Sequence, residues 1–97
     1  MASKMFVGVC QIEIMLPDSD SLKAKRFVLS SIKTKIQNKF NVSVAEVGNN
    51  DLWQRGLLGL ALVTNEQKFV DQTFNKILEL LYQEDRLEVL GHTIEVY

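Results

Sequence analysis

The side chains best suited to chemistry in this sequence are cations clustered on one predicted helix. Six cations and no acid lie between residues 22 and 39: Lys23, Lys25, Arg26, Lys33, Lys35 and Lys39. A basic helix can bind RNA phosphates without reading sequence. The alternative is a solvated surface attracted to an acidic neighbour, since segment 66–85 carries five acids against two lysines.

Two aromatic residues accompany these cations. Phe27 is predicted on the side of the first helix opposite its core stripe, where it could stack on a base, pack under loop 49–53 or meet a neighbouring subunit. Trp53 beside Arg55 could form a stacking platform with a charged rim. Alternatively, Trp53 covers one end of the core and Arg55 pairs with an acid such as Glu46. The candidate nucleic-acid-binding residues are Lys23, Lys25, Arg26, Phe27, Trp53 and Arg55.

Catalytic and metal-binding patterns are missing from the sequence. It contains one histidine, His92, and one cysteine, Cys10, which excludes an internal disulfide and a multi-cysteine zinc site. Asp18 and Asp20 lack the later glycine and glutamate of a calcium loop. No nucleophile triad, phosphate loop or carboxylate pair is present. We therefore expect a protein that is not an enzyme and uses no cofactor and no metal.

Length and composition predict a single domain over residues 1–97, because 97 residues can bury one core. The net charge of −1 gives no global signature of a nucleic-acid or membrane binder. Gln11 and Glu13 interrupt the only apolar stretch that resembles a signal peptide, and no run is long enough to span a membrane. These features predict a cytoplasmic protein without membrane contact.

The first half of the chain predicts a strand and a helix. Residues 5–14 alternate between two faces, as in a strand with one apolar side. Ser21 is a suitable N-cap for a helix that runs to about Phe40, and Asn41 suits the left-handed residue that follows a helix. The apolar stripe of this helix consists of Leu22, Leu29, Ile32, Ile36 and Phe40.

Three cations of this helix, Lys25, Arg26 and Lys33, fall on or beside its apolar stripe. We expect their stems to cover apolar surface and their charged ends to reach water.

The second half predicts a hairpin, a helix and a last strand. Residues 42–47 and 54–64 read as strands, and the second is apolar on both faces, as expected for a central strand. Thr64 fits a capping box for a helix to about Glu84. A final strand over residues 87–97 is expected to bend or bulge at Gly91.

The order β-α-β-β-α-β predicts the ferredoxin-like fold, of the α+β class: a four-stranded antiparallel sheet with two helices on one face. The first and third strands then lie in the middle. The face away from the helices is too apolar to remain in water, which predicts self-association into a symmetric homo-oligomer. The residues expected on that face are Val7, Val9, Leu57, Gly59, Ala61 and Val63.

Three blocks, SLKAKR at 21–26, FNVSVAEV at 40–47 and DLWQRGLLGLALV at 51–63, resemble the YlxP-like family, small bacterial proteins with a domain of unknown function. The resemblance covers nearly the whole chain and implies a ferredoxin-like fold. Genes of the family often lie near those for translation initiation and ribosome maturation factors, which implies a link to RNA or ribosomes. The chain departs from the family at 48–50, and no catalytic residue carries over. The family's signature positions are Ser21, Leu22, Lys23, Lys25, Arg26, Asp51, Trp53, Gln54 and Arg55.

These observations favour a non-enzymatic protein that binds ribosomal RNA or a ribosomal particle. In that interpretation Lys23, Lys25, Arg26 and Arg55 contact phosphates, and Trp53 or Phe27 stacks. The alternative is a self-associating structural or adaptor module that uses the apolar outer sheet face and has no nucleic-acid role.

Overall fold

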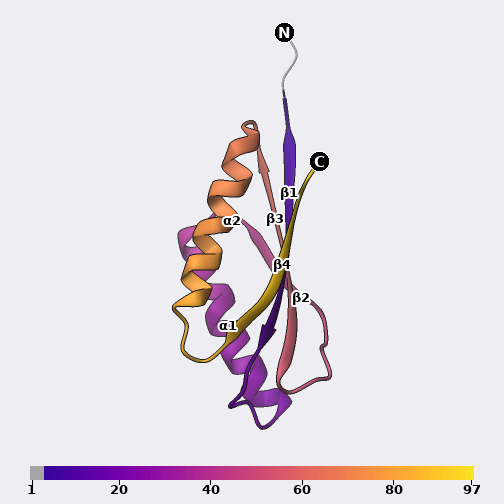
Figure 1. Cartoon of the computed structure of the whole chain (residues 1–97), viewed down its shortest axis with the longest axis vertical. Coiled ribbons are helices and arrows are strands. Elements are labelled where there is room, and N and C mark those ends of the chain that lie inside the picture. The colour runs from indigo at the N-terminus through magenta and orange to yellow at the C-terminus, as the bar shows by residue number, and fades with distance from the viewer. Residues whose placement is uncertain (1–3) are drawn as a thin grey trace.

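The computed structural model describes residues 4–97 as one sheet and two helices (Figure 1). The predicted order β-α-β-β-α-β is confirmed, with element ends within a few residues of those expected. The elements are β1 (Phe6–Met15), α1 (Leu22–Lys39), β2 (Ser43–Gly48), β3 (Arg55–Thr64), α2 (Gln67–Tyr82) and β4 (Glu88–Val96).

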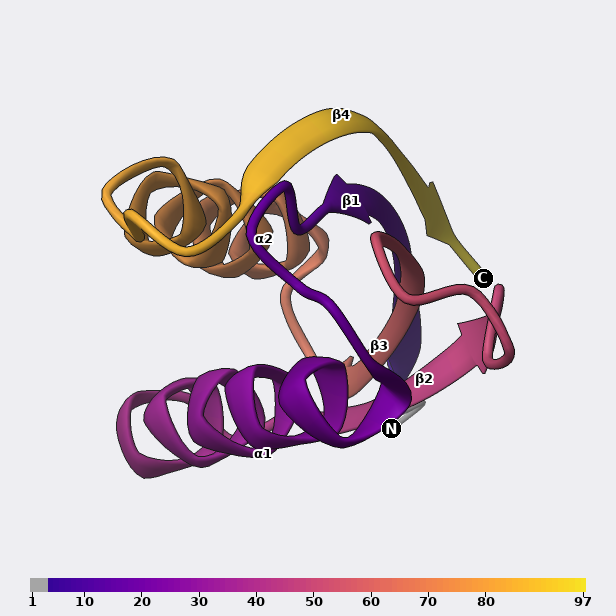
Figure 2. The same ribbon diagram turned by 90° about the horizontal axis from the view of Figure 1, so that it is seen from below.

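The strands form one antiparallel sheet in the order β2-β3-β1-β4, so β1 and β3 are central and β2 and β4 lie at the edges. Both helices lie on the same side of this sheet (Figure 2). The predicted ferredoxin-like α+β fold is confirmed. The molecule is elongated, with extents of 54 × 23 × 21 Å.

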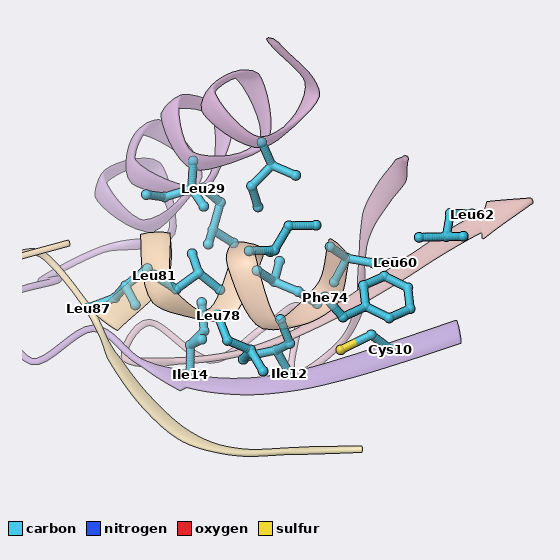
Figure 3. Packing of buried hydrophobic residues seen from close by; sticks show 14 of the residues in the cluster. Cys10, Ile12, Ile14, Leu29, Leu60, Leu62, Phe74, Leu78, Leu81 and Leu87 are labelled. Carbon is cyan, nitrogen blue, oxygen red and sulfur yellow. The ribbon is translucent and has the colours of Figure 1, made fainter. Parts of the chain in front are cut away.

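The core lies between the sheet and the helices (Figure 3). Alternate residues of β1 and β3 point inward because successive side chains of a strand face opposite sides. They meet the apolar stripes of the two helices, and burial of these side chains is the main stabilising term of the fold. The core includes Cys10, Ile12, Ile14, Leu58, Leu60, Leu62, Leu29, Ile32, Ile36, Val70, Phe74, Ile77, Leu78 and Leu81.

Gly8 shows how closely α2 approaches the sheet. A Cβ atom at this position would lie 2.5 Å from Val70 Cγ1 and 3.1 Å from Phe74 Cε2. The absence of a side chain at Gly8 therefore lets the start of α2 pack directly on β1.

The ends of α1 confirm one prediction and correct another. Ser21 is the N-cap, and its Oγ accepts a hydrogen bond from the Ala24 N–H at 3.0 Å. The prediction of a left-handed Asn41 is wrong, because α1 ends at an extended Phe40. Among residues 4–97, the non-glycine residue with positive φ is Asn49, at 58°, in the loop between β2 and β3.

Two details of the second half also differ from or refine the predictions. The capping box at Thr64 is wrong: α2 begins at Gln67 after Glu66, and Thr64 Oγ1 accepts from the Glu66 N–H at 3.2 Å instead. The predicted bulge in β4 is confirmed beside Gly91, which pairs with Glu13 while the next ladder pair is Val89 with Ile14. Leu90 is the extra residue.

Candidate functional site

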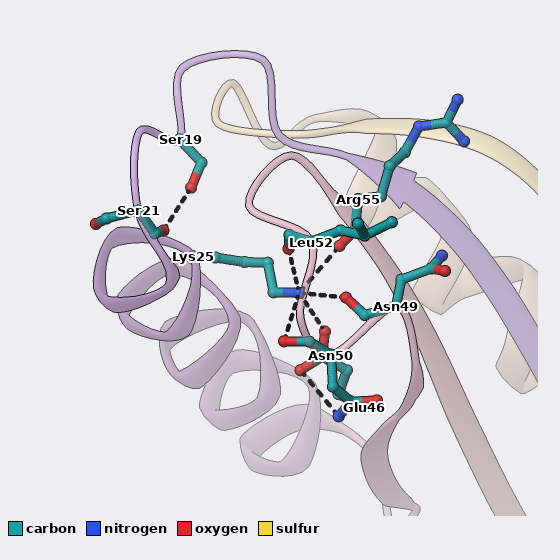
Figure 4. A network of polar contacts seen from close by, with 8 residues as sticks. All are labelled: Ser19, Ser21, Lys25, Glu46, Asn49, Asn50, Leu52 and Arg55. Atoms are coloured by element: carbon teal, nitrogen blue, oxygen red, sulfur yellow. Dashed lines mark hydrogen bonds and ion pairs between the residues drawn. The ribbon is translucent and has the colours of Figure 1, made fainter.

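Lys25, one of the predicted phosphate-binding residues, is fully buried, with 0% of its surface exposed. Its Nζ donates to the carbonyl oxygens of Asn49 at 2.8 Å, Leu52 at 2.7 Å and Arg55 at 3.0 Å (Figure 4). The prediction that Lys25 reaches solvent and contacts phosphate is therefore wrong. Its place in the first turn of α1, next to the core stripe, aims the side chain at the loop between β2 and β3.

Two further oxygens complete what we call the Lys25 cage. The Asn50 carbonyl oxygen lies 3.5 Å from Lys25 Nζ, and Glu46 Oε2 forms an ion pair with it at 2.8 Å. A lysine ammonium has three N–H donors, so these oxygens share them. A buried charge needs such partners because leaving water is otherwise costly. The cage ties loop 49–54 to the start of α1.

Gln54 holds the same loop from another side. Its Nε2 donates to the carbonyl oxygens of Pro17 at 3.1 Å and Ser19 at 3.3 Å. The Gln54 carbonyl oxygen in turn accepts from the Leu16 N–H at 2.9 Å. Both contacts link loop 49–54 to the segment between β1 and α1, so the loop is fixed at both of its ends.

Trp53 and Arg55 line one shallow hollow of about 510 Å³ beside this loop, together with Asp51, Leu52 and Gln54. Trp53 is 54% exposed, so the prediction that it covers the core is wrong. Arg55 begins β3 on the face away from the helices, where its Nη1 pairs with Glu13 Oε1 at 2.7 Å. The expected pairing of Arg55 with Glu46 is also wrong, since Glu46 belongs to the Lys25 cage. Arg55 and the exposed side of α1 are consequently separated by the sheet.

Three cations of α1, exposed Lys23 and Arg26 and half-buried Lys33, form a stripe beside the edge strand β2. Arg26, Ser30 and Lys33 line a groove of about 230 Å³ together with Leu29, Glu46 and Leu58. Positions spaced by three and four residues share one helix side, which extends the stripe in both directions. This basic stripe consists of Lys23, Arg26, Ser30, Lys33 and Gln37.

Sequence reasoning did not single out Ser30 and Gln37. Their spacing of three and four residues from the lysines and Arg26 was the available signal.

The charges along the basic stripe are not matched by acids. Among residues 4–97, Lys23, Arg26 and Lys33 form no ion pair. Glu46 is the acid that lines the groove, and Lys25 already compensates its charge at 2.8 Å. The groove between α1 and β2 is therefore positive.

On the opposite flank of α1, the charged side chains form ion pairs. Lys35 Nζ lies 3.1 Å from Glu84 Oε2, and Arg86 Nε lies 2.7 Å from Glu84 Oε1. Hydrogen bonds from the Arg86 side chain, with a smaller one from Lys35, lower the pKa of Glu84 to about 2. The predicted attraction between the basic and acidic segments is confirmed for Lys35 and Glu84, on this flank.

Phe27 stands out from α1 into solvent, with 73% of its surface exposed. The alternative that it packs under loop 49–53 is therefore wrong. It follows Arg26 in the chain and flanks the basic stripe. Contact of Phe27 with a base or with a neighbouring subunit stays a prediction.

The outer sheet face carries the apolar residues that the alternation predicted. Val7, Val9, Leu57 and Ala61 are half-buried, and Val63 is exposed. Around Gly59 this face is hollowed by about 370 Å³, and Val47 of β2 leans over the glycine: a Cβ there would lie 2.8 Å from Val47 Cγ1. The lining residues are Val9, Gln11, Ser43, Val44, Ala45, Val47, Gly59, Leu60 and Ala61.

The remaining candidates are structural or isolated. Cys10 is in the core, and burial raises the pKa of its thiol to about 11, so the thiol stays protonated at neutral pH. His92 is exposed on β4. Residues 4–97 hold no group of three or more His, Cys, Asp or Glu side chains arranged to bind a metal ion. Neither helix of the described chain is long and apolar enough to cross a membrane.

Comparisons with known proteins agree with this architecture. Residues 7–94 match the family described as "Protein of unknown function (DUF503)". The uncharacterized protein YlxP of Bacillus subtilis is 39% identical over 75 residues, which cover 77% of this chain and 82% of that protein. A de novo designed protein, Foldit4, has a TM-score of 0.52 at 13% identity and covers 97% of this chain and 94% of its own, a likeness of fold alone.

Proposed function

The chain belongs to the DUF503 family, and we propose that it is a non-enzymatic protein that binds the phosphate backbone of RNA through the basic stripe of α1. The observation that carries this proposal is the groove between α1 and β2. Arg26 and Lys33 both line it, and its acid, Glu46, is already compensated by buried Lys25. A positive groove whose carboxylate is already paired with a lysine suits an anionic ligand.

The dimensions of the basic stripe suit a polymer of phosphates better than a single anion. From Lys23 to Gln37 it covers fifteen residues, and the rise of 1.5 Å per residue places its ends about 21 Å apart. The Ser30 hydroxyl and the Gln37 amide can donate to phosphate oxygens between the cations. The cations therefore follow a path rather than converging on one point.

The free state of the stripe favours binding. Lys23, Arg26 and Lys33 form no ion pair within residues 4–97, so contact with phosphate breaks no existing salt bridge there. Phe27 beside Arg26 offers a ring on which an unpaired base can stack. We infer that single-stranded RNA binds more tightly than duplex. The gene neighbourhood implied by the resemblance to the YlxP-like family makes ribosomal RNA the first ligand to test.

The test is a fluorescence-anisotropy titration of ribosomal RNA fragments over a series of salt concentrations. We expect the logarithm of the binding constant to fall linearly with the logarithm of salt. In Arg26→Ala/Lys33→Ala, loss of two contacts should reduce the slope by about 1.4–1.8. The matched control is Lys68→Ala/Lys76→Ala, which removes two exposed cations of α2. Salt-independent binding, or equal losses in both double variants, contradicts the proposal.

A further inference from the structure

We propose that two copies of this chain associate through their outer sheet faces, about a twofold axis parallel to the central strands β1 and β3. The starting observation is the apolar face away from both helices. Val63 on it is 66% exposed and Val47 is 53% exposed, next to half-buried Val7 and Val9. Such a contiguous apolar surface marks a contact site, and a symmetric pair is the simplest way to cover it.

The axis follows from the charges at one end of this face. A twofold axis that runs along the strands between β1 and β3 places β3 of one copy over β1 of the other. Glu13 of β1 and Leu57 of β3 are at the same level, and Arg55 is the next outward residue. Arg55 of each copy then lies over Met15 of the other, one outward residue from its Glu13. The long Arg55 side chain reaches that Glu13, so the two intrachain pairs join in one network of four charges.

A twofold axis perpendicular to the strands is much less favourable. An axis that runs across the strands reverses one face relative to the other. Arg55 and Glu13 would then lie against Val7 and Val63 of the second copy, which pair with each other at the far end of β1 and β3. Covering a charged pair with valines removes its water without supplying a partner. The charge pattern therefore selects the axis along the strands.

The surface shape of the outer sheet face also fits a twofold axis along the strands. Gln11 of β1 is level with Gly59 of β3, so the proposed axis places the exposed Gln11 of one copy over the hollow at Gly59 of the other. At the same level, the axis places Ala45 on β2 of one copy over Thr93 on β4 of the other, so small side chains meet at the edges of the interface. Aligned packing of this kind is usual for two sheets about 10 Å apart.

The size of the face is sufficient for a stable pair. The strands have ten, ten, nine and six residues, and at about 3.4 Å per residue and about 4.8 Å between strands they give each copy a face of roughly 600 Å². Two such faces bury roughly 1,200 Å², at the lower end of the range for specific complexes. We therefore expect dissociation in the micromolar range rather than a permanent dimer.

The test uses charge reversal in separate chains, measured by sedimentation velocity. In Arg55→Glu, the carboxylate at 55 lies one outward residue from Glu13 of the second copy, and Glu13→Arg brings two cations equally close. Each variant alone should dimerise roughly tenfold or more weakly than the wild type. An equimolar mixture of the two variants should recover association, because both contacts between copies then join opposite charges.

The mixture separates contacts between copies from the contact within one chain. Each single variant keeps its own unfavourable intrachain pair after mixing, so recovery can come only across the interface. A wild-type monomer at tens of micromolar overturns the proposal, and failure of the mixture to recover overturns the axis.

Ala61→Glu supplies a second variant, since it buries a charge at the interface and should abolish the dimer. Thermal unfolding of every variant confirms that it folds. The basic stripe lies on the other side of the molecule, so these outcomes are independent of RNA binding.

Discussion

Lys25 and Arg26 are consecutive cations of α1, yet they belong to two regions with opposite properties. Lys25 is completely buried and surrounded by four carbonyl oxygens and one carboxylate. Arg26 is exposed, lines the groove beside β2 and forms no ion pair among residues 4–97. The Lys25 cage is therefore a structural device, and the basic stripe is a surface available to a ligand.

The difference comes from what lies opposite each side chain. Successive residues of a helix point in directions about a quarter-turn apart. That rotation takes Lys25 toward loop 49–54, whose carbonyl groups have no strand partner, and takes Arg26 toward solvent. A cation beside the core stripe can therefore donate hydrogen bonds to the backbone carbonyl groups of a loop. The charge of a residue alone does not distinguish this structural role from ligand binding.

The largest effect is expected from removing the caged cation. Lys25→Met leaves the half-buried Glu46 without its ion-pair partner and removes the donor to the carbonyl oxygens of Asn50, Leu52 and Arg55, while the Asn49 oxygen keeps the Leu52 N–H at 3.0 Å. We expect a loss of about 3–5 kcal/mol in the free energy of unfolding, measured by urea denaturation. Lys23→Met, two positions away on the exposed side, is the matched control and should change little. Equal stability of the two variants would contradict the cage.

A second variant separates the ion pair from the carbonyl contacts within the cage. Lys25→Met/Glu46→Leu also removes the stranded carboxylate, so it should recover about 1–2 kcal/mol of the loss. It should remain less stable than the wild type, because the carbonyl oxygens of Leu52 and Arg55 still lack the donor that Lys25 supplied. Urea denaturation of both variants measures the recovery. Full recovery would show that the carbonyl contacts contribute nothing.

A smaller, pH-dependent effect is expected on the flank of α1 that faces α2. Hydrogen bonding from Arg86 lowers the pKa of Glu84 from 4.5 to about 2 in the folded chain. The lower folded pKa means that Glu84 stabilises the protein above pH 4.5, and that this contribution is lost as the pH falls toward about 2. Glu84→Gln should cost about 1 kcal/mol at neutral pH, and its difference from the wild type should shrink over that interval. A difference that is constant with pH would contradict the assignment.

The smallest effect on stability is expected in the basic stripe. Arg26→Ala/Lys33→Ala removes two cations that have no ion-pair partner within residues 4–97, so the free energy of unfolding should change by less than about 0.5 kcal/mol. Urea denaturation measures it beside the RNA titration. A large destabilisation would place these residues in the structural class with Lys25 and remove the distinction between the two regions.

The fold was predictable because its information is local and periodic. Alternation in β1 and β3 and the stripes of α1 and α2 identify the elements, and the order of elements with right-handed crossovers selects the sheet topology. The N-cap at Ser21 and the bulge beside Gly91 were equally visible, since single residue types signal them.

The candidate site was predictable only in part. The sequence shows that α1 is basic, but the fate of Lys25 depends on a loop that starts 24 residues later and on the φ angle of Asn49 within it. The partner of Arg55 likewise depends on the register between β1 and β3, which brings Glu13 beside it instead of Glu46. Contacts of this kind join segments that no periodic pattern connects.

The position of β1 has a consequence for how the chain is made. β1 pairs with β3 on one side and with β4 on the other, although β4 lies about 80 residues further along the chain. At about 5–20 residues per second, a ribosome needs roughly 4–16 s to produce β4 after β1 has been synthesised. Throughout that interval the nascent chain has a central strand with an open edge, so folding is completed only when the last strand emerges and closes it.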